Sequence, residues 1–137
     1  MALVWTQALA IGIEEIDEQH RELFRRVDRL LEAAAGDGGE VAPLLAFLRE
    51  YVVQHFAAEE RYMADQAYPG RAAHEAEHRG FVADLVALDA DFVARGVGGA
   101  VSARLNRQVA DWLRGHVLVT DVALGRFVRR ARRPAAG

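Results

Sequence analysis

The 137-residue sequence contains no cysteine and no lysine, and only three prolines. Without cysteine, the chain cannot form a disulfide, a thiolate nucleophile, an iron–sulfur cluster or a cysteine-rich zinc site. Without lysine, all 17 basic residues are arginines, so Schiff-base chemistry on a lysine amine is excluded. The sequence also lacks any apolar run near the roughly 18 residues of a membrane-spanning helix. We therefore expect no membrane span and none of these cysteine or lysine chemistries.

A strong net charge and an N-terminal targeting signal are also lacking. The net charge of -3 gives no general attraction to nucleic acid or to a membrane surface. The first residues, MALVWTQALAIGIEE, have neither the basic start nor the small-residue cleavage site of a signal peptide. We expect a cytoplasmic protein that acts as a monomer and binds no nucleic acid.

Positive charge is concentrated only in the C-terminal segment RFVRRARRPAAG. Its five arginines are Arg126, Arg129, Arg130, Arg132 and Arg133. Cations at a helix C-terminus complement the helix dipole, and this is the preferred interpretation. A docking site for an acidic partner is the alternative.

Three breaks that contain glycine or proline divide the chain: GDGG at 36–39, YPG at 68–70 and GVGG at 96–99. In the four segments around them, apolar residues recur at i, i+3, i+4 and i+7, and no alternating strand pattern competes. Pro43 falls in the first turn of the second segment. The sequence therefore predicts an all-α fold, an up-down-up-down four-helix bundle with an N-terminal arm at residues 1–12, forming one domain over 1–137.

All five histidines fall on the apolar stripes of these predicted helices: His20, His55, His74, His78 and His116. Two acids, Glu59 and Asp121, lie near them in the sequence. A single histidine on such a stripe is usually a core residue with a hydrogen-bond partner. Counted from the loops at 1.5 Å per residue, however, all seven residues fall into one layer toward the second loop. This coincidence predicts a metal site.

The spacing of the candidate ligands suits chelation. In HEAEH, His74 and His78 are four residues apart and share a helix face, and His55 and Glu59 repeat this relation in HFAAE. In HVLVTD, the fifth residue after His116 is Asp121, which a regular helix turns away by about 140°. Either the aspartate reaches sideways or the helix contains a wide turn such as a π-bulge.

The number of candidate ligands suits two ions better than one. Five imidazoles and two bridging carboxylates supply nine bonds, and a bridging oxide or hydroxide brings the number to eleven. Two octahedral ions have twelve positions, so one position stays open for a small ligand. Nitrogen and oxygen ligands without sulfur suit iron, manganese, zinc or copper. A purely structural site is disfavoured, because structural sites are usually closed.

In these residues the chain resembles the single-domain bacterial haemerythrins. The resemblance runs through the arm with Trp5, then GIEEIDEQH, HFAAEE, YPGRAAHEAEH and WLRGHVLVTD in that order. It implies two iron ions with an oxo or hydroxo bridge and reversible binding of dioxygen. It also implies a division of ligands: His74, His78 and His116 on one iron, His20 and His55 on the other, and Glu59 and Asp121 as bridges. Dioxygen would then bind at the iron with two histidines.

The pocket around the bound dioxygen should be apolar. The resemblance assigns Leu113, beside Trp112, to the wall of this pocket. Phe56, Trp112 and Tyr62 are further candidates for the wall, although ordinary core is the preferred interpretation for any one of them. Asp17 either hydrogen-bonds a ligand imidazole or, the preferred interpretation, is a first-turn acid of the first helix.

The leading hypothesis for function is a binding protein, not an enzyme, for carriage, storage or delivery of dioxygen to a possible protein acceptor. A histidine-rich site stabilises high-valent iron less than a carboxylate-rich one, and no acid or base beyond the ligands is evident. The alternatives are a di-iron enzyme that reduces peroxide or nitric oxide, and a sensor of oxygen, redox state or iron.

Overall fold

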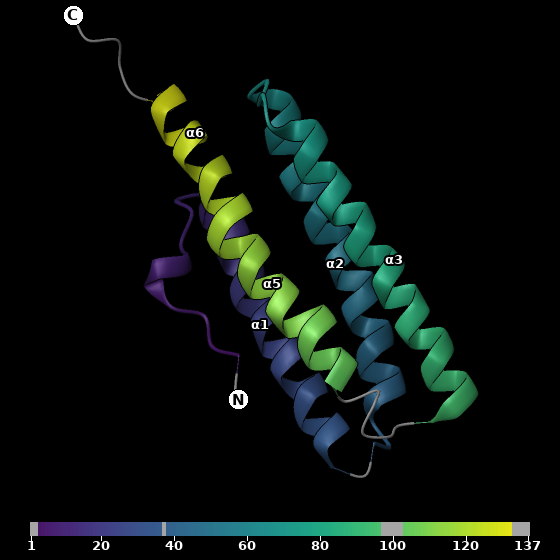
Figure 1. Cartoon of the computed structure of the whole chain (residues 1–137). Helices are drawn as coiled ribbons and strands as arrows, with labels where there is room; N and C mark the ends of the chain where they lie inside the picture. The colour runs from purple at the N-terminus through teal and green to yellow at the C-terminus, as the bar shows by residue number, and fades with distance from the viewer. Residues whose placement is uncertain (1–2, 37, 97–102, 133–137) are drawn as a thin grey trace, which may run out of the picture.

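The computed structural model describes residues 3–36, 38–96 and 103–132, which contain helices but no strand. The first three long helices are α1 (Glu14–Ala35), α2 (Val41–Asp65) and α3 (Arg71–Arg95). A fourth rod is described from residue 103 and consists of η2 (Asn106–Asp111), α5 (Trp112–Gly115), η3 (His116–Asp121) and α6 (Val122–Arg132). Neighbouring rods run antiparallel (Figure 1), which confirms the predicted four-helix bundle.

Glycine ends α1 and α3 at the first and third predicted breaks. The N–H of Gly36 donates to two carbonyls of the last turn of α1. Gly96 follows α3 with a φ of 72°, a conformation that costs little only for glycine. Pro43 lies in the first turn of α2, where its missing N–H removes no intrahelical hydrogen bond. Asp37 and residues 97–99 of the predicted breaks lie outside the described residues.

Two apolar clusters fill the bundle, one on each side of a buried polar layer. The larger cluster includes Leu23 and Phe56 and extends toward the first and third connections. The smaller cluster includes Ile16 and Met63 and lies toward the second connection. On α2, Glu59 is completely buried between Phe56 of the larger cluster and Met63 of the smaller one. Such a layer costs much free energy unless its polar groups have partners.

The N-terminal arm contains a short 3-10 turn, η1 (Gln7–Leu9), and is fastened to both α1 and α6. The buried carboxylate of Asp17 accepts the backbone N–H groups of Ile11 at 2.8 Å and Gly12 at 3.2 Å. Arg129 donates to the carbonyl of Ile11 at 2.8 Å. Gly125 permits this close approach, since a Cβ there would lie 2.3 Å from that carbonyl oxygen. Asp17 is thus a first-turn acid, as preferred, and its carboxylate binds the arm.

The arginines of the C-terminal segment lie at the end of the fourth rod. Arg129, Arg130 and Arg132 are in the last described turn of α6, and Arg126 lies one turn earlier. Arg133 lies outside the described residues. Docking of an acidic partner here stays a prediction. No helix within the described ranges is both long enough and apolar enough to span a membrane.

Candidate metal centre

All seven candidate ligands point into the polar layer of the bundle. Each is at most 4% exposed to solvent. They come from every rod: His20 on α1, His55 and Glu59 on α2, His74 and His78 on α3, and His116 and Asp121 on η3. The structure therefore brings together all the residues that the sequence predicts for the metal site.

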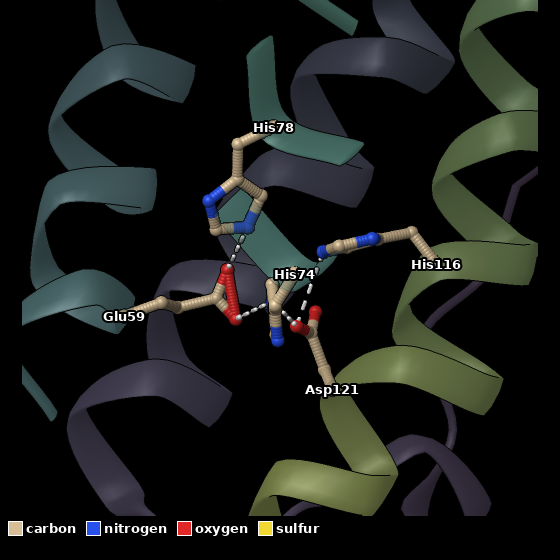
Figure 2. A group of neighbouring side chains, drawn as sticks. All are labelled: Glu59, His74, His78, His116 and Asp121. Atoms are coloured by element: carbon tan, nitrogen blue, oxygen red, sulfur yellow. Dashed lines mark ion pairs between the residues drawn. The ribbon is translucent and has the colours of Figure 1, made fainter. Parts of the chain in front are cut away.

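The seven side chains form two overlapping groups of possible metal ligands. The first consists of Glu59, His74, His78, His116 and Asp121, whose imidazoles and carboxylates face one another in Figure 2. The second consists of His20, His55, Glu59 and Asp121. Within each group the ligand atoms lie within 4.8 Å of one another. The two carboxylates belong to both groups, so they lie where bridges between two ions would lie.

Asp121 lies in contact with imidazoles of both groups. Its Oδ1 lies 3.0 Å from Nε2 of His74 and 3.2 Å from Nε2 of His116. Its Oδ2 lies 3.1 Å from Nε2 of His20, on the other side. One carboxylate thus reaches imidazoles of both groups, one oxygen toward each.

Glu59 contacts imidazoles of both groups through a single oxygen. Its Oε1 lies 3.2 Å from Nε2 of His55 and 3.3 Å from Nε2 of His78. Its other oxygen is farther from the remaining rings, at 3.9 Å from His74 and 4.0 Å from His20. The two groups therefore meet at this carboxylate as well.

A π-helix brings His116 and Asp121, which are five residues apart, onto one face of the fourth rod. The segment η3 spans these two residues, and a π-turn places residues i and i+5 on one face. The result is the 3.2 Å contact between His116 Nε2 and Asp121 Oδ1. Of the two solutions that the sequence leaves open, the wide turn is the one that the structure adopts.

Several inward-facing atoms of the centre are buried without a hydrogen-bond partner in the described structure. These atoms are Nε2 of His20, His74, His78 and His116, and both carboxylate oxygens of Glu59 and Asp121. Buried polar atoms are almost always satisfied, because each unsatisfied one costs about 1–3 kcal/mol. Cations in their midst would satisfy all of them together. Imidazole and carboxylate donors without sulfur fit iron, among the transition metals that the donor set allows.

Burial and neighbouring charges shift the ionisation of these groups. Burial, followed by the negative charge of Asp121, raises the pKa of Glu59 well above its ordinary value. Burial also acts to raise the pKa of Asp121, but the charge of His116 and other polar neighbours outweigh it and hold this pKa well below its ordinary value. Burial lowers the pKa of His78 to about 3. An imidazole binds a metal only when unprotonated, so burial prepares this ring for a cation.

Three of the imidazoles form a hydrogen bond through their outward-facing Nδ1 with an acceptor on another helix. Nδ1 of His55 lies 2.8 Å from Oε1 of Gln19, and Nδ1 of His78 lies 2.8 Å from Oε2 of Glu60. An Nδ1–H that donates outward leaves the lone pair of Nε2 pointing inward, which is the tautomer that a metal requires. These acceptors were missed in the sequence, although each directly adjoins a candidate ligand in the chain.

The third outer hydrogen bond links α3 to the fourth rod. Nδ1 of His116 lies 2.9 Å from Oε1 of Glu77, which also accepts the hydroxyl of Thr120 at 2.9 Å. In contrast, Nδ1 of His20 and of His74 has no partner among the described residues. Outer hydrogen bonds therefore orient the rings of His55, His78 and His116, whereas those of His20 and His74 have none within the described structure.

Aromatic rings close the side of the centre that faces the larger apolar cluster. Phe56 stacks on His78 with ring centroids 3.8 Å apart, and Trp112 stacks on His116 at 4.5 Å. Leu113 is buried in the same cluster. The remaining candidate for the wall, Tyr62, packs against the smaller cluster and donates its hydroxyl to a surface glutamate.

Comparisons with known proteins agree with this arrangement. A family model described as the Hemerythrin HHE cation binding domain matches residues 11–126, a range that contains all seven candidate ligands. The chain is 37% identical over 129 residues to a bacteriohemerythrin of Methylococcus capsulatus, covering 91% of this chain and 96% of that protein. It is 33% identical over 87 residues to a myohemerythrin of Riftia pachyptila, covering 64% of this chain and 68% of that protein.

Solved structures show the same architecture. A crystal structure of wild-type hemerythrin matches with a TM-score of 0.81 and 32% sequence identity, over 93% of this chain and 98% of that one. The family model covers far more than half of the sequence, and the fold and the buried histidine-rich layer agree with it. On this evidence the chain belongs to the hemerythrin family.

Proposed function

We propose that this chain binds dioxygen reversibly at a pair of iron ions and thereby carries, stores or delivers it. The observation that carries the proposal is the division of seven buried ligands into two groups that share both carboxylates. The first ion would be held by His74, His78 and His116, the second by His20 and His55, and both by Glu59 and Asp121. A pair of ferrous ions supplies the electrons and the open coordination position that reversible dioxygen binding needs.

The unequal division of imidazoles supports one open position. With both carboxylates and an oxo or hydroxo group as bridges, the ion with three imidazoles would have six ligands. The ion beside His20 and His55 would have five ligands, which would leave one position for a small molecule. A site that keeps an open position is suited to ligand binding and not to a purely structural role.

The protein around the site favours binding over chemical turnover. The buried polar residues of the described structure are the seven candidate ligands and Asp17, whose carboxylate is already used by the arm. No additional acid or base among them reaches into the enclosed centre. Reduction of bound dioxygen beyond reversible binding needs protons, and the stacked rings of Phe56 and Trp112 help to exclude water that would supply them.

Reversibility is the property that tests the proposal. The protein is loaded with ferrous iron without air, exposed to dioxygen, and returned to vacuum while its ultraviolet–visible spectrum is followed. We expect an oxygenated spectrum that appears and disappears over many cycles. Rapid irreversible oxidation with turnover of peroxide or nitric oxide would instead support the enzyme alternative and contradict the proposal.

The setting in which the chain acts stays a prediction. We expect a monomer in the cytoplasm that passes dioxygen to a protein acceptor. Analytical ultracentrifugation of the iron-loaded protein tests the monomer, because a dimer would sediment as a species of twice the mass.

A further inference from the structure

Dioxygen needs a path through the wall of the bundle, because the candidate ligands are sealed from solvent. Each of them is at most 4% exposed. On the side of α1 and α6, the arm closes the wall where Ile11 packs against Gly125. Near the second connection, the rings of Tyr68 and Phe127 pack with centroids 5.1 Å apart. Both of these sides are therefore covered by well-packed residues.

A groove on the surface between α2 and α3 reaches the candidate centre from the opposite side. Its volume is about 450 Å³. Its lining is mostly apolar, with three polar members, and consists of Val53, Phe56, Ala57, Glu60, His78, Arg79, Val82 and Ala83. His78 is a candidate ligand of the first ion, and Phe56 also packs against His55 of the second, with ring centroids 5.8 Å apart. The groove therefore ends beside both halves of the centre.

The floor of the groove consists of two stacked rings with different freedom to move. Phe56 and His78 lie with centroids 3.8 Å apart and planes 4° from parallel. His78 is fixed by its outer hydrogen bond to Glu60 at 2.8 Å, and a bound metal would fix it from the inside. The phenyl ring of Phe56 forms no hydrogen bond. Its ring is held by packing alone, against Phe81 and Trp112 as well as His78, so its displacement opens the floor without breaking a hydrogen bond.

We propose that dioxygen enters and leaves through this groove and that Phe56 is the barrier it must pass. The inference rests on the proposed function, since it concerns the same centre. Dioxygen is small and apolar, so it loses little solvation in a groove lined by valine, alanine and phenylalanine. Hydrated anions would lose the water that solvates their charge before they reached the floor, which disfavours their entry.

Filling the groove tests the route through the kinetics of oxygenation. Ala57 and Ala83 are exposed residues of its walls, so Ala57→Phe and Ala83→Phe add bulk without touching the buried layer. A narrower path raises the free-energy barrier to dioxygen passage without changing the stability of the free or the oxygenated protein. We expect the association and dissociation rates to fall together on the order of tenfold, the effect of about 1.4 kcal/mol on a barrier, while the equilibrium constant stays the same.

The neighbouring groove provides a matched control. Ala46 is an exposed alanine of α2 that lines a second groove of about 420 Å³ further along the same helix pair. Ala46→Phe should leave both rates unchanged. Rates that are unchanged in Ala57→Phe and Ala83→Phe, or equally slowed in Ala46→Phe, would overturn the route. If the route fails in this way but the wild type still oxygenates reversibly, the proposed function stands. If the wild type never oxygenates, both the route and the proposed function are overturned.

Xenon provides a readout that needs no iron. It is apolar, binds in apolar cavities and is silent toward redox chemistry. In the metal-free protein under xenon pressure, we expect saturable shifts of the methyl resonances of Ala57 and Ala83. In Ala57→Phe the shift at Ala83 should disappear. Absence of shifts at both wild-type methyl groups would show that the groove does not admit an apolar ligand and would overturn the route.

Discussion

At the scale of single residues, the candidate centre depends on which nitrogen of each imidazole faces inward. His55 and His78 donate through Nδ1 to Gln19 and Glu60, so their Nε2 atoms face the shared carboxylate of Glu59. Partners of this kind typically change metal affinity by about 10–100-fold when removed. The ligand itself should matter more than the residue that orients it.

Substitution of Glu59 tests this order of importance. Glu59→Gln keeps the shape of the side chain but removes the negative charge that would bridge two cations. We expect iron binding to fall by more than the roughly 100-fold of an outer partner, with fewer than two ions retained per chain after desalting. The metal-free variant should still fold, because a neutral amide can be buried there in place of the carboxyl.

Glu60→Gln is the matched control for that experiment. Its amide oxygen can still accept the hydrogen bond from His78, so two ions should remain bound. Elemental analysis of both variants measures the result. Equal retention of two ions by Glu59→Gln and Glu60→Gln would contradict the bridging role of Glu59.

Leu113 offers a test of the apolar pocket. Leu113→Ala removes a side chain that is only 1% exposed and should cost about 2–5 kcal/mol of unfolding free energy through the cavity it leaves. It should also speed autoxidation of the oxygenated protein, because water gains access. Leu88 is equally buried, at 1%, and Leu88→Ala should destabilise similarly without faster autoxidation. Equal autoxidation rates in the two variants, followed by absorbance in air, would remove Leu113 from the pocket.

The sequence predicts the candidate metal ligands better than the residues that hydrogen-bond and orient them. Histidines on apolar stripes are visible because the helical period alone places them inside. Gln19, Glu60 and Glu77 act across helix pairs, so their roles depend on how each helix is rotated against its neighbour. The periodicity of one segment does not contain that information.

At the scale of the elements, the π-helical segments are the feature that sequence predicts only in part. The five-residue spacing of His116 and Asp121 indicates a wide turn at η3, and the structure contains one. The other π-helix, η2 at Asn106–Asp111, was not predicted, since no pair of candidate ligands spans it. It ends at Asp111, directly before α5 begins at Trp112.

The contact between the arm and α6 predicts a strong effect of a small substitution. In Gly125→Ala, the added Cβ would lie 2.3 Å from the carbonyl oxygen of Ile11, so the arm or the helix must move. We expect a loss of about 1–3 kcal/mol of unfolding free energy, the usual cost of overpacking. Denaturant unfolding of the metal-free protein measures it.

A second glycine in a helix provides the comparison. Gly80 lies on α3, and a Cβ added there meets no atom within 4 Å. Gly80→Ala should therefore stabilise the protein by up to about 1 kcal/mol, the difference in helix propensity. If Gly125→Ala were also stabilising, the close approach of the arm to α6 would be disproved.

At the scale of the whole molecule, the polar layer separates two apolar clusters and makes stability depend on the metal. Without cations, buried nitrogens and oxygens of the layer lack partners. Binding to the folded state alone should add about 2.7 kcal/mol at a free iron concentration about 100 times the dissociation constant. Anaerobic calorimetry should show a higher Tm with ferrous iron than without, and an unchanged Tm would argue against binding in this layer.

The bundle itself follows from sequence because its signals are local and repeated. Glycine breaks, helical periodicity and short connections each indicate antiparallel rods. The fastening of the arm does not follow, because Gly125 and Arg129 on α6 are more than 100 residues from Ile11 and Asp17 and meet them only after the rods have packed. The groove between α2 and α3 is hidden for the same reason, since its shape depends on small alanines that face each other across two helices.

The central claim is that these seven side chains hold two iron ions, and anomalous diffraction at the iron edge from crystals of the anaerobically loaded protein tests it most directly. The account predicts two peaks per chain inside the polar layer, one nearest His74, His78 and His116 and the other nearest His20 and His55. A single peak, or iron found only at the surface of the bundle, would contradict it.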